Sequence, residues 1–314
     1  MNRNADLGAG FLEAVGKPLS RDVSLKELSS FRIGGSADMF FEASTSGELA
    51  AAFGFARLAG VPHYVVGGGY NILFADEGYR GLIVRNRTQG LTPGSEPGEV
   101  EVLSGTLLSR LLQHALDGGL EGLEFLAGIP GTVGGALYGN AGAFGRAMGD
   151  VFVRAILLGD DGNERPATRE DMTFGYRQSA LKKRPAVALS AVLRAVPGDP
   201  ERIRKAVLEN LECRREKQPA WGTPCAGSYF KNPVLADGKK VPAGRLLEEV
   251  GAKELRVGDA AVFSGHANFL INLGDARAAD VLALAAELKE RVRERSGIVL
   301  EEEVIYLPEA VSGP

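Results

Sequence analysis

The stretch VVGGGYNILFAD, residues 65–76, places three consecutive glycines between two apolar segments. A longer glycine-rich stretch, GIPGTVGGALYGNAGAFG, occupies residues 128–145. Glycine lacks a Cβ, so such runs permit tight turns and let the backbone approach a ligand closely. Successive backbone N–H groups in turns of this kind can surround an anion. The two stretches therefore predict a pair of loops around a phosphate-bearing ligand, with tight turns alone as the alternative.

Neither stretch fits the commoner nucleotide-binding motifs. Gly67 and Gly69 could begin the pattern G-x-G-x-x-G after a strand, but Ile72 occupies the place of its last glycine. A phosphate loop of the Walker type requires Ser or Thr after Gly-Lys, and residues 16–18 and 238–240 lack it. A bound dinucleotide would therefore depend on another arrangement of glycine-rich backbone.

The hydrophobic pattern around these stretches predicts an α+β fold. Asp199 and Pro200 have the form of a helix N-cap followed by proline at the first helical position. Periodicity and turn residues predict helices at 46–59, 106–116, 199–217, 242–250 and 278–295, and strands at 62–66, 99–103, 151–158, 186–193, 269–272 and 298–307.

Length and composition narrow the class of protein. The 314 residues exceed the ~250–300 at which a single core stops growing, so we expect two or three domains around a shared cleft. A net charge of -4 argues against a nucleic-acid-binding protein. Cys213 and Cys225 lack the spacing of a zinc site, so we expect reduced thiols and no metal. Without a signal-peptide core or an apolar stretch of ~18 residues, the sequence favours a cytoplasmic protein with no membrane partner.

Eight blocks in order, from about residue 29 to residue 307, resemble the UDP-N-acetylmuramate dehydrogenases. This family has the flavin-binding fold of vanillyl-alcohol oxidase. The blocks are SSFRIGGSAD (29–38), VVGGGYNILFAD (65–76), GIPGTVGGALYGNAGAFG (128–145), GYRQSALKKR (175–184), AGSYFKNP (226–233), GRLLEEVGAKELRVGDA (244–260), HANFLIN (266–272) and LEEEV (300–304).

The resemblance implies an FAD-binding module of two subdomains and a smaller α+β substrate-binding domain. We expect the first FAD-binding subdomain at 21–85, the second at 86–205 together with 297–314, and the substrate-binding domain at 206–296. The short interval from Arg177 to Ser228 resembles the subtype that lacks an extra substrate-capping insertion.

The resemblance also assigns the cofactor site. FAD is expected to be noncovalent, since His63, His114 and His266 lie outside both glycine blocks. Tyr70 departs from the serine usual after the glycines. The residues expected to bind FAD are Gly67, Gly68, Gly69, Asn71, Ile72, Gly128, Ile129, Pro130, Gly131, Gly134, Gly135 and Ala136.

The activity implied is the NADPH-dependent reduction of UDP-N-acetylglucosamine enolpyruvate to UDP-N-acetylmuramate, a step of peptidoglycan precursor synthesis. Hydride passes from NADPH to FAD, then from flavin N5 to the enolpyruvyl methylene, and a proton is added to the neighbouring carbon. The matching residues are Arg177 for the developing carboxylate charge, Ser228 as proton donor and Glu303 as catalytic carboxylate. Glu301 is the alternative, because Glu302 replaces the proline usual between the two glutamates.

Four further residues match positions that contact the substrate in the family: Tyr176, Lys217, Asn232 and Asn268. Arg214, Lys182, Lys183 and Lys231 are further cations that could bind a pyrophosphate. A serine hydroxyl is a weak acid, and Lys217 and Asn232 are the neighbours expected to polarise Ser228.

Two other functions remain open at this point. An FAD-linked oxidase or dehydrogenase of the same fold acting on another alcohol would retain the glycine blocks but not AGSYFKNP or LEEEV. A noncatalytic protein that binds a nucleotide or a UDP-sugar would need neither Ser228 nor Glu303, and it would be colourless after purification.

Overall fold

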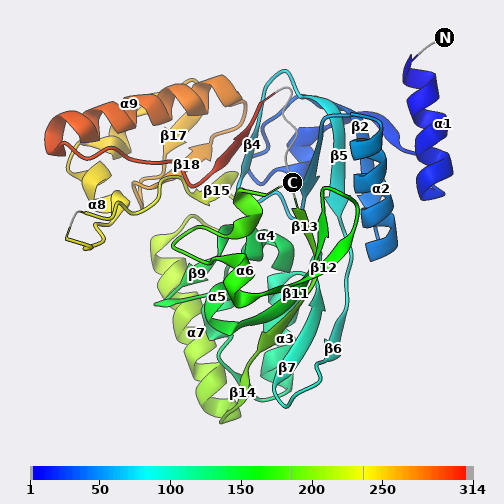
Figure 1. Cartoon of the computed structure of the whole chain (residues 1–314). Helices are drawn as coiled ribbons and strands as arrows, with labels where there is room; N and C mark the ends of the chain where they lie inside the picture. Colours follow the sequence, from blue (N-terminus) through cyan, green and yellow to red (C-terminus); the bar gives the residue numbers. More distant parts are fainter. Residues whose placement is uncertain (1–2, 185, 236, 309–314) are drawn as a thin grey trace.

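The computed structural model describes residues 3–184, 186–235 and 237–308. Three groups of elements surround a common centre, with α1 and α2 on one side, α8 and α9 on another and β6–β14 below (Figure 1). None of the helices in these ranges combines the length and the apolar composition that crossing a bilayer requires.

The first group is a sheet covered by two helices. α2 (Ser46–Leu58) is capped by Thr45, whose hydroxyl accepts the N–H of Glu48. α1 (Arg3–Val15), which the sequence analysis missed, packs its Phe11 against Phe41 and Phe55. The sheet has the order β1 (Ser20–Ser24), β2 (Ser36–Ala43), β5 (Tyr79–Asn86) and β3 (His63–Val66).

The second group is a five-stranded antiparallel sheet with its own core. The sheet has the order β12 (Glu164–Thr168), β11 (Phe152–Gly159), β13 (Ala186–Arg194), β7 (Glu99–Leu103) and β6 (Leu91–Pro93). Its helices are α3 (Leu108–Asp117), α4 (Val133–Gly139), α5 (Met148–Val151), α6 (Arg169–Met172) and α7 (Pro200–Lys217).

The third group has a small sheet in the order β15 (Cys225–Ser228), β18 (Phe269–Asn272), β17 (Ala260–Val262) and β16 (Arg256–Val257). α8 (Ala243–Glu248) and α9 (Ala278–Ser296) cover it. The apolar stripe predicted for α9 is confirmed, because Val281, Leu284, Leu288 and Val292 are all buried.

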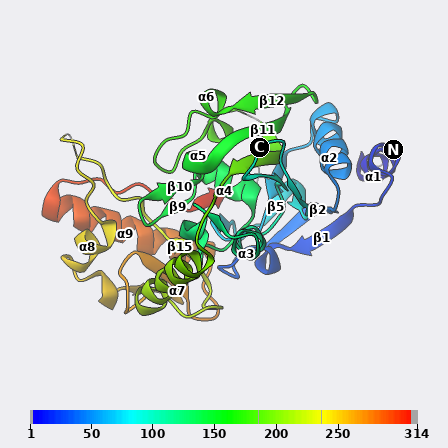
Figure 2. The ribbon, with the colours of Figure 1, turned by 90° about the horizontal axis from the view of Figure 1, so that it is seen from below.

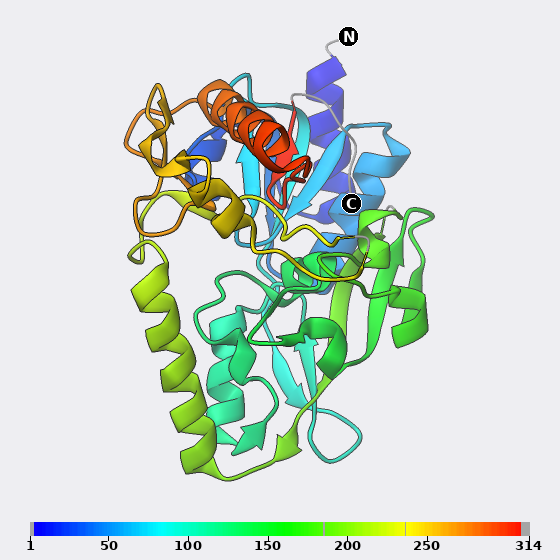
Figure 3. The ribbon, with the colours of Figure 1, turned by 90° about the vertical axis from the view of Figure 1, so that its left-hand side faces the viewer.

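Two features of the structure do not follow the expected domain boundaries. The C-terminal strand β19 (Ile305–Leu307) pairs in parallel with β4 (Ile72–Phe74), which follows the first glycine loop, although 297–314 was expected to join the second subdomain. The expected boundary at 205/206 falls inside α7, which runs beside α3 of the second group (Figures 2 and 3). Val207 of α7 packs there against Leu112 and Ala127.

Most of the predicted helices and strands are present. The errors occur where contacts between distant segments, and not the local sequence pattern, decide the secondary structure. The strand predicted at 298–307 is wrong over residues 298–304, of which Glu302 alone forms a bridge, to Phe230.

The shorter elements are η1 (Leu25–Leu28), β8 (Leu120–Glu121), η2 (Glu124–Leu126), β9 (Gly142–Ala143), β10 (Arg146–Ala147), η3 (Ala180–Lys182), β14 (Val196–Pro197) and η4 (Ala252–Glu254).

Candidate active site

A cavity of about 660 Å³ lies where the three groups of elements meet. All twelve residues expected to bind FAD line this cavity, although they come from two loops far apart in the sequence. Arg177, Ser228 and Glu303 line it as well. Cavities of this size are typical of sites for small molecules and cofactors.

The first glycine loop needs its glycines for reasons of space. Gly69 has φ +70°, and a Cβ there would lie 1.7 Å from the carbonyl oxygen of Leu28. A Cβ on Gly67 would lie 2.3 Å from Oγ1 of Thr132, so the two glycine blocks are in contact. Across the described ranges, the N–H groups of Gly67, Gly68 and Gly69 donate to no backbone carbonyl. Unpaired N–H groups facing a cavity suit a phosphate.

Two serines hold this loop in place. Ser29 donates its hydroxyl to the carbonyl of Ile72 at 3.0 Å. Ser30 donates to the carbonyl of Cys225 at 2.6 Å and lies 3.3 Å from that of Gly69. Both serines thus anchor the first loop, and Ser30 also ties it to β15.

The second glycine block contains a short helix that the sequence analysis missed. Thr132 caps α4, since its Oγ1 accepts the N–H of Gly135. Gly131 has φ +126°, and no atom of the described residues lies within 4 Å of the position where its Cβ would be. The block therefore presents open backbone to the cavity at Gly131.

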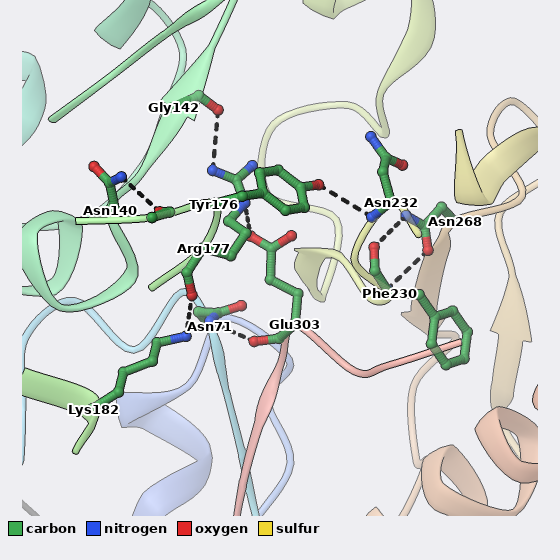
Figure 4. A network of polar contacts seen from close by, with 11 residues as sticks. Asn71, Asn140, Gly142, Tyr176, Arg177, Lys182, Phe230, Asn232, Asn268 and Glu303 are labelled. Carbon is green, nitrogen blue, oxygen red and sulfur yellow. Dashed lines mark hydrogen bonds and ion pairs between the residues drawn. The ribbon is translucent and has the colours of Figure 1, made fainter. Parts of the chain in front are cut away.

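The side chains of Arg177 and Glu303 point toward each other at the wall of the cavity (Figure 4). Nε of Arg177 lies 2.6 Å from Oε1 of Glu303, and the geometry is that of an ion pair without an aligned hydrogen bond. Nη1 of Arg177 donates to the carbonyl of Gly142 at 3.2 Å. Asn71 donates its side-chain N–H to the backbone carbonyl of Glu303 at 3.0 Å and so links the first glycine loop to the main chain of this residue.

The three consecutive glutamates contact three different cations. Glu303 pairs with Arg177 inside the cavity, whereas Glu301 pairs with Lys231 at 2.9 Å and has 73% of its side chain exposed. Glu302 pairs with Lys289 of α9, also at 2.9 Å. The three glutamates precede β19 and do not lie in a regular strand, so strand alternation does not put Glu301 and Glu303 on one face.

Ser228 ends β15 opposite Phe269, and it lines the cavity. The polarising contacts expected for its hydroxyl are not made in the described part of the chain: Lys217 is exposed at the end of α7, and the side chain of Asn232 accepts the N–H of Ala243. Proton donation by Ser228 stays a prediction.

The four residues expected to contact substrate lie beside the cavity lining and not in it. The hydroxyl of Tyr176 accepts the backbone N–H of Asn232 at 3.1 Å. Asn268 is 3% exposed, and its amide oxygen and nitrogen are both bonded to the backbone of Phe230. Asn268 therefore orders the segment that follows Ser228. Direct contact of the four residues with the substrate stays a prediction.

Arg214, one of the cations that could bind a pyrophosphate, lines the cavity, and so does Trp221, which the sequence analysis did not assign to the site. Nε of Arg214 is buried and has no hydrogen-bond partner among the described residues, and its guanidinium lies 5.5 Å from the ring centroid of Phe144. Burial, followed by the positive charge of Arg177, lowers the pKa of Arg214. Trp221 is 81% exposed at the rim. The only sequence signal for Arg214 was the basic end of its helix, which is also typical of a solvated surface.

Comparison with known proteins gives the family. Residues 37–164 match an FAD binding domain, and residues 218–307 match the C-terminal domain of UDP-N-acetylenolpyruvoylglucosamine reductase. The chain is 42% identical to that reductase from Moorella thermoacetica, over 92% of this chain and 91% of the relative. It is 40% identical to the one from Geobacter metallireducens, over 96% and 98%.

A solved structure agrees with this assignment. UDP-N-acetylenolpyruvylglucosamine reductase (MurB) from Thermus caldophilus superposes with a TM-score of 0.77 at 36% identity, covering 92% of this chain and 99% of that one. The α+β fold and the FAD-binding domain predicted from the sequence are thereby confirmed. The chain belongs to the UDP-N-acetylenolpyruvoylglucosamine reductase family and is an FAD-dependent oxidoreductase.

Proposed function

We propose that this chain reduces UDP-N-acetylglucosamine enolpyruvate to UDP-N-acetylmuramate, with NADPH as reductant and noncovalent FAD as carrier, in the cytoplasm. The observation that carries the proposal is the convergence of Arg177, Ser228 and Glu303 on the cavity that the two glycine blocks line. An FAD-linked oxidase acting on another alcohol would need the glycine loops but not these three side chains.

The residues around the cavity fit FAD. The N–H groups of Gly67, Gly68 and Gly69, which donate to no backbone carbonyl of the described residues, suit its pyrophosphate. The open backbone at Gly131 leaves room for a flat ring system. When bound, FAD would supply hydride transfer between the nicotinamide and the enolpyruvyl group.

The protein's own groups supply charge and a proton. Arg177 would stabilise the negative charge that develops on the substrate carboxylate, an effect worth about 3–4 kcal/mol for a single well-placed contact. Glu303 would hold the guanidinium at 2.6 Å so that little reorganisation is needed during the reaction. Ser228, which also lines the cavity, would donate the proton. The UDP moiety would be bound near Tyr176, Lys217, Asn232 and Asn268.

The test is the visible spectrum of the purified protein. A flavin spectrum should be bleached by NADPH under anaerobic conditions and restored by UDP-N-acetylglucosamine enolpyruvate. A colourless protein that takes up no FAD would contradict the proposal, and restoration by oxygen or by simple alcohol-derived carbonyls but not by the enolpyruvyl substrate would favour the alternative oxidase.

We expect Gly135→Leu to abolish FAD binding without unfolding the protein. Gly135 lies in α4 and lines the cavity, and its Cβ position has one neighbour, Oγ1 of Thr132 at 3.5 Å, so the added side chain would fill ligand space. Leucine is a better helix former than glycine, so the helix should persist. The measurement is the FAD content and flavin absorbance of the purified variant.

Gly54→Leu is the matched control for this prediction. Gly54 lies in α2, outside the cavity lining, and has nothing within 4 Å of its Cβ position. This variant should retain FAD. Equal FAD content in the Gly135 variant and the wild type would show that the cofactor lies elsewhere.

A further inference from the structure

Arg177 adopts a backbone conformation that its residue type rarely takes. Its φ is +54°, in the left-handed region, where a non-glycine residue is strained. The surrounding turn is closed by two backbone bonds between Gly175 and Gln178, at 3.0 and 3.1 Å. Such strain persists only where neighbouring groups hold it.

Two side chains hold this turn from opposite ends (Figure 4). Asn140 donates its side-chain N–H to the carbonyl of Gly175 at 2.8 Å. Lys182 donates from Nζ to the carbonyl of Arg177 itself at 2.9 Å. Asn140 is in turn fixed, because its Oδ1 accepts the N–H of Gly149.

Lys182 contacts the turn and not the ligand space. It ends η3 and does not line the cavity, unlike Arg177. Its ammonium lies 5.5 Å from the ring centroid of Tyr138. Burial lowers the pKa of Lys182, as do the charges of Lys231 and Arg177, and Glu303 opposes the shift. Partial burial of a cation costs free energy unless the cation is hydrogen-bonded, and the carbonyl of Arg177 provides that hydrogen bond.

We propose that Lys182 is a positioning residue that, through its hydrogen bond to the carbonyl of Arg177, holds that residue in its strained conformation so that the guanidinium faces Glu303. The inference rests on the proposed function for its kinetic consequence. Lys182 acts through Arg177 and makes no contact with substrate. A displacement of about 1 Å in a reacting group can cost 100-fold in rate.

The kinetic test is a double-mutant cycle on the reoxidation of reduced flavin by the enolpyruvyl substrate. We expect Lys182→Met to slow this half-reaction about 10-fold and Arg177→Met about 100-fold. The double variant should be no slower than Arg177→Met alone, because the two residues act as a unit. Lys182→Arg, which keeps a donor, should recover part of the loss. Additive effects would overturn the proposal.

A second readout does not depend on activity. In the FAD-loaded protein, Lys182→Met should speed hydrogen–deuterium exchange at the amides of Gly175 and Gln178. Arg184→Met is the matched control, since it removes an exposed cation from the same segment, and it should leave this exchange unchanged. Unchanged exchange in the Lys182 variant would overturn the proposal. If the wild type failed to reduce the enolpyruvyl substrate, the proposed function would fail while this measurement still decided the role of Lys182.

Discussion

Ser228→Ala will slow reoxidation of the reduced flavin by the enolpyruvyl substrate by about 100- to 10,000-fold, the range for loss of a positioned proton donor. The rate of flavin reduction by NADPH in this variant should stay within about 3-fold of the wild-type rate, because that half-reaction needs no proton from the Ser228 hydroxyl. Stopped-flow measurement of the flavin absorbance separates the two half-reactions.

The control for this variant is Ser20→Ala, which removes a hydroxyl from an exposed position in β1. Both half-reactions should stay unchanged in it. If Ser228→Ala slowed the two half-reactions equally, Ser228 would be shaping the cofactor site and the role as proton donor would be rejected. Because Ser228 lines the cavity and Lys217 is exposed, the polarising neighbour of the hydroxyl would have to come from bound substrate or from closure of the site.

The parts of the fold that were predictable are those with a local physical signal. The apolar stripe of α9 repeats at helical spacing, and Asp199 with Pro200 marks the start of α7, where the Asp199 side chain accepts the N–H of Glu201. The glycine loops were recognisable because Gly69 and Gly131 have backbone angles that favour glycine. Such signals are contained in a few consecutive residues.

What the sequence did not predict depends on contacts between distant segments. Arg214 could be named only as one of several candidate cations, because its helix end has the composition of a solvated surface; in the structure α7 packs so that its Nε is buried at the cavity. α4 was hidden because four of its seven residues are glycine or alanine, which gives no hydrophobic stripe. The pairing of β19 with β4, which brings Glu303 to Asn71, joins residues more than 200 positions apart. No local pattern specifies such a pairing.

Glu303→Gln will slow reoxidation of the flavin by the enolpyruvyl substrate about 100-fold or more, while reduction by NADPH is largely retained. The amide keeps the size of the side chain but removes the charge that lies 2.6 Å from Nε of Arg177. The guanidinium would then lose its fixed orientation, and preorganised charge of this kind is worth about 3–4 kcal/mol of barrier.

Glu301→Gln is the matched control, since it makes the same chemical change two residues away. Glu301 has 73% of its side chain exposed and pairs with Lys231, and exposed ion pairs contribute little, about 0–1 kcal/mol. Its rates should stay within about 3-fold of wild type. The opposite ranking would assign the catalytic carboxylate to Glu301 and would require the segment after Leu300 to rotate in the working enzyme. A much larger loss of rate in Glu303→Gln than in Glu301→Gln would instead place the catalytic charge at the ion pair of Arg177 and Glu303.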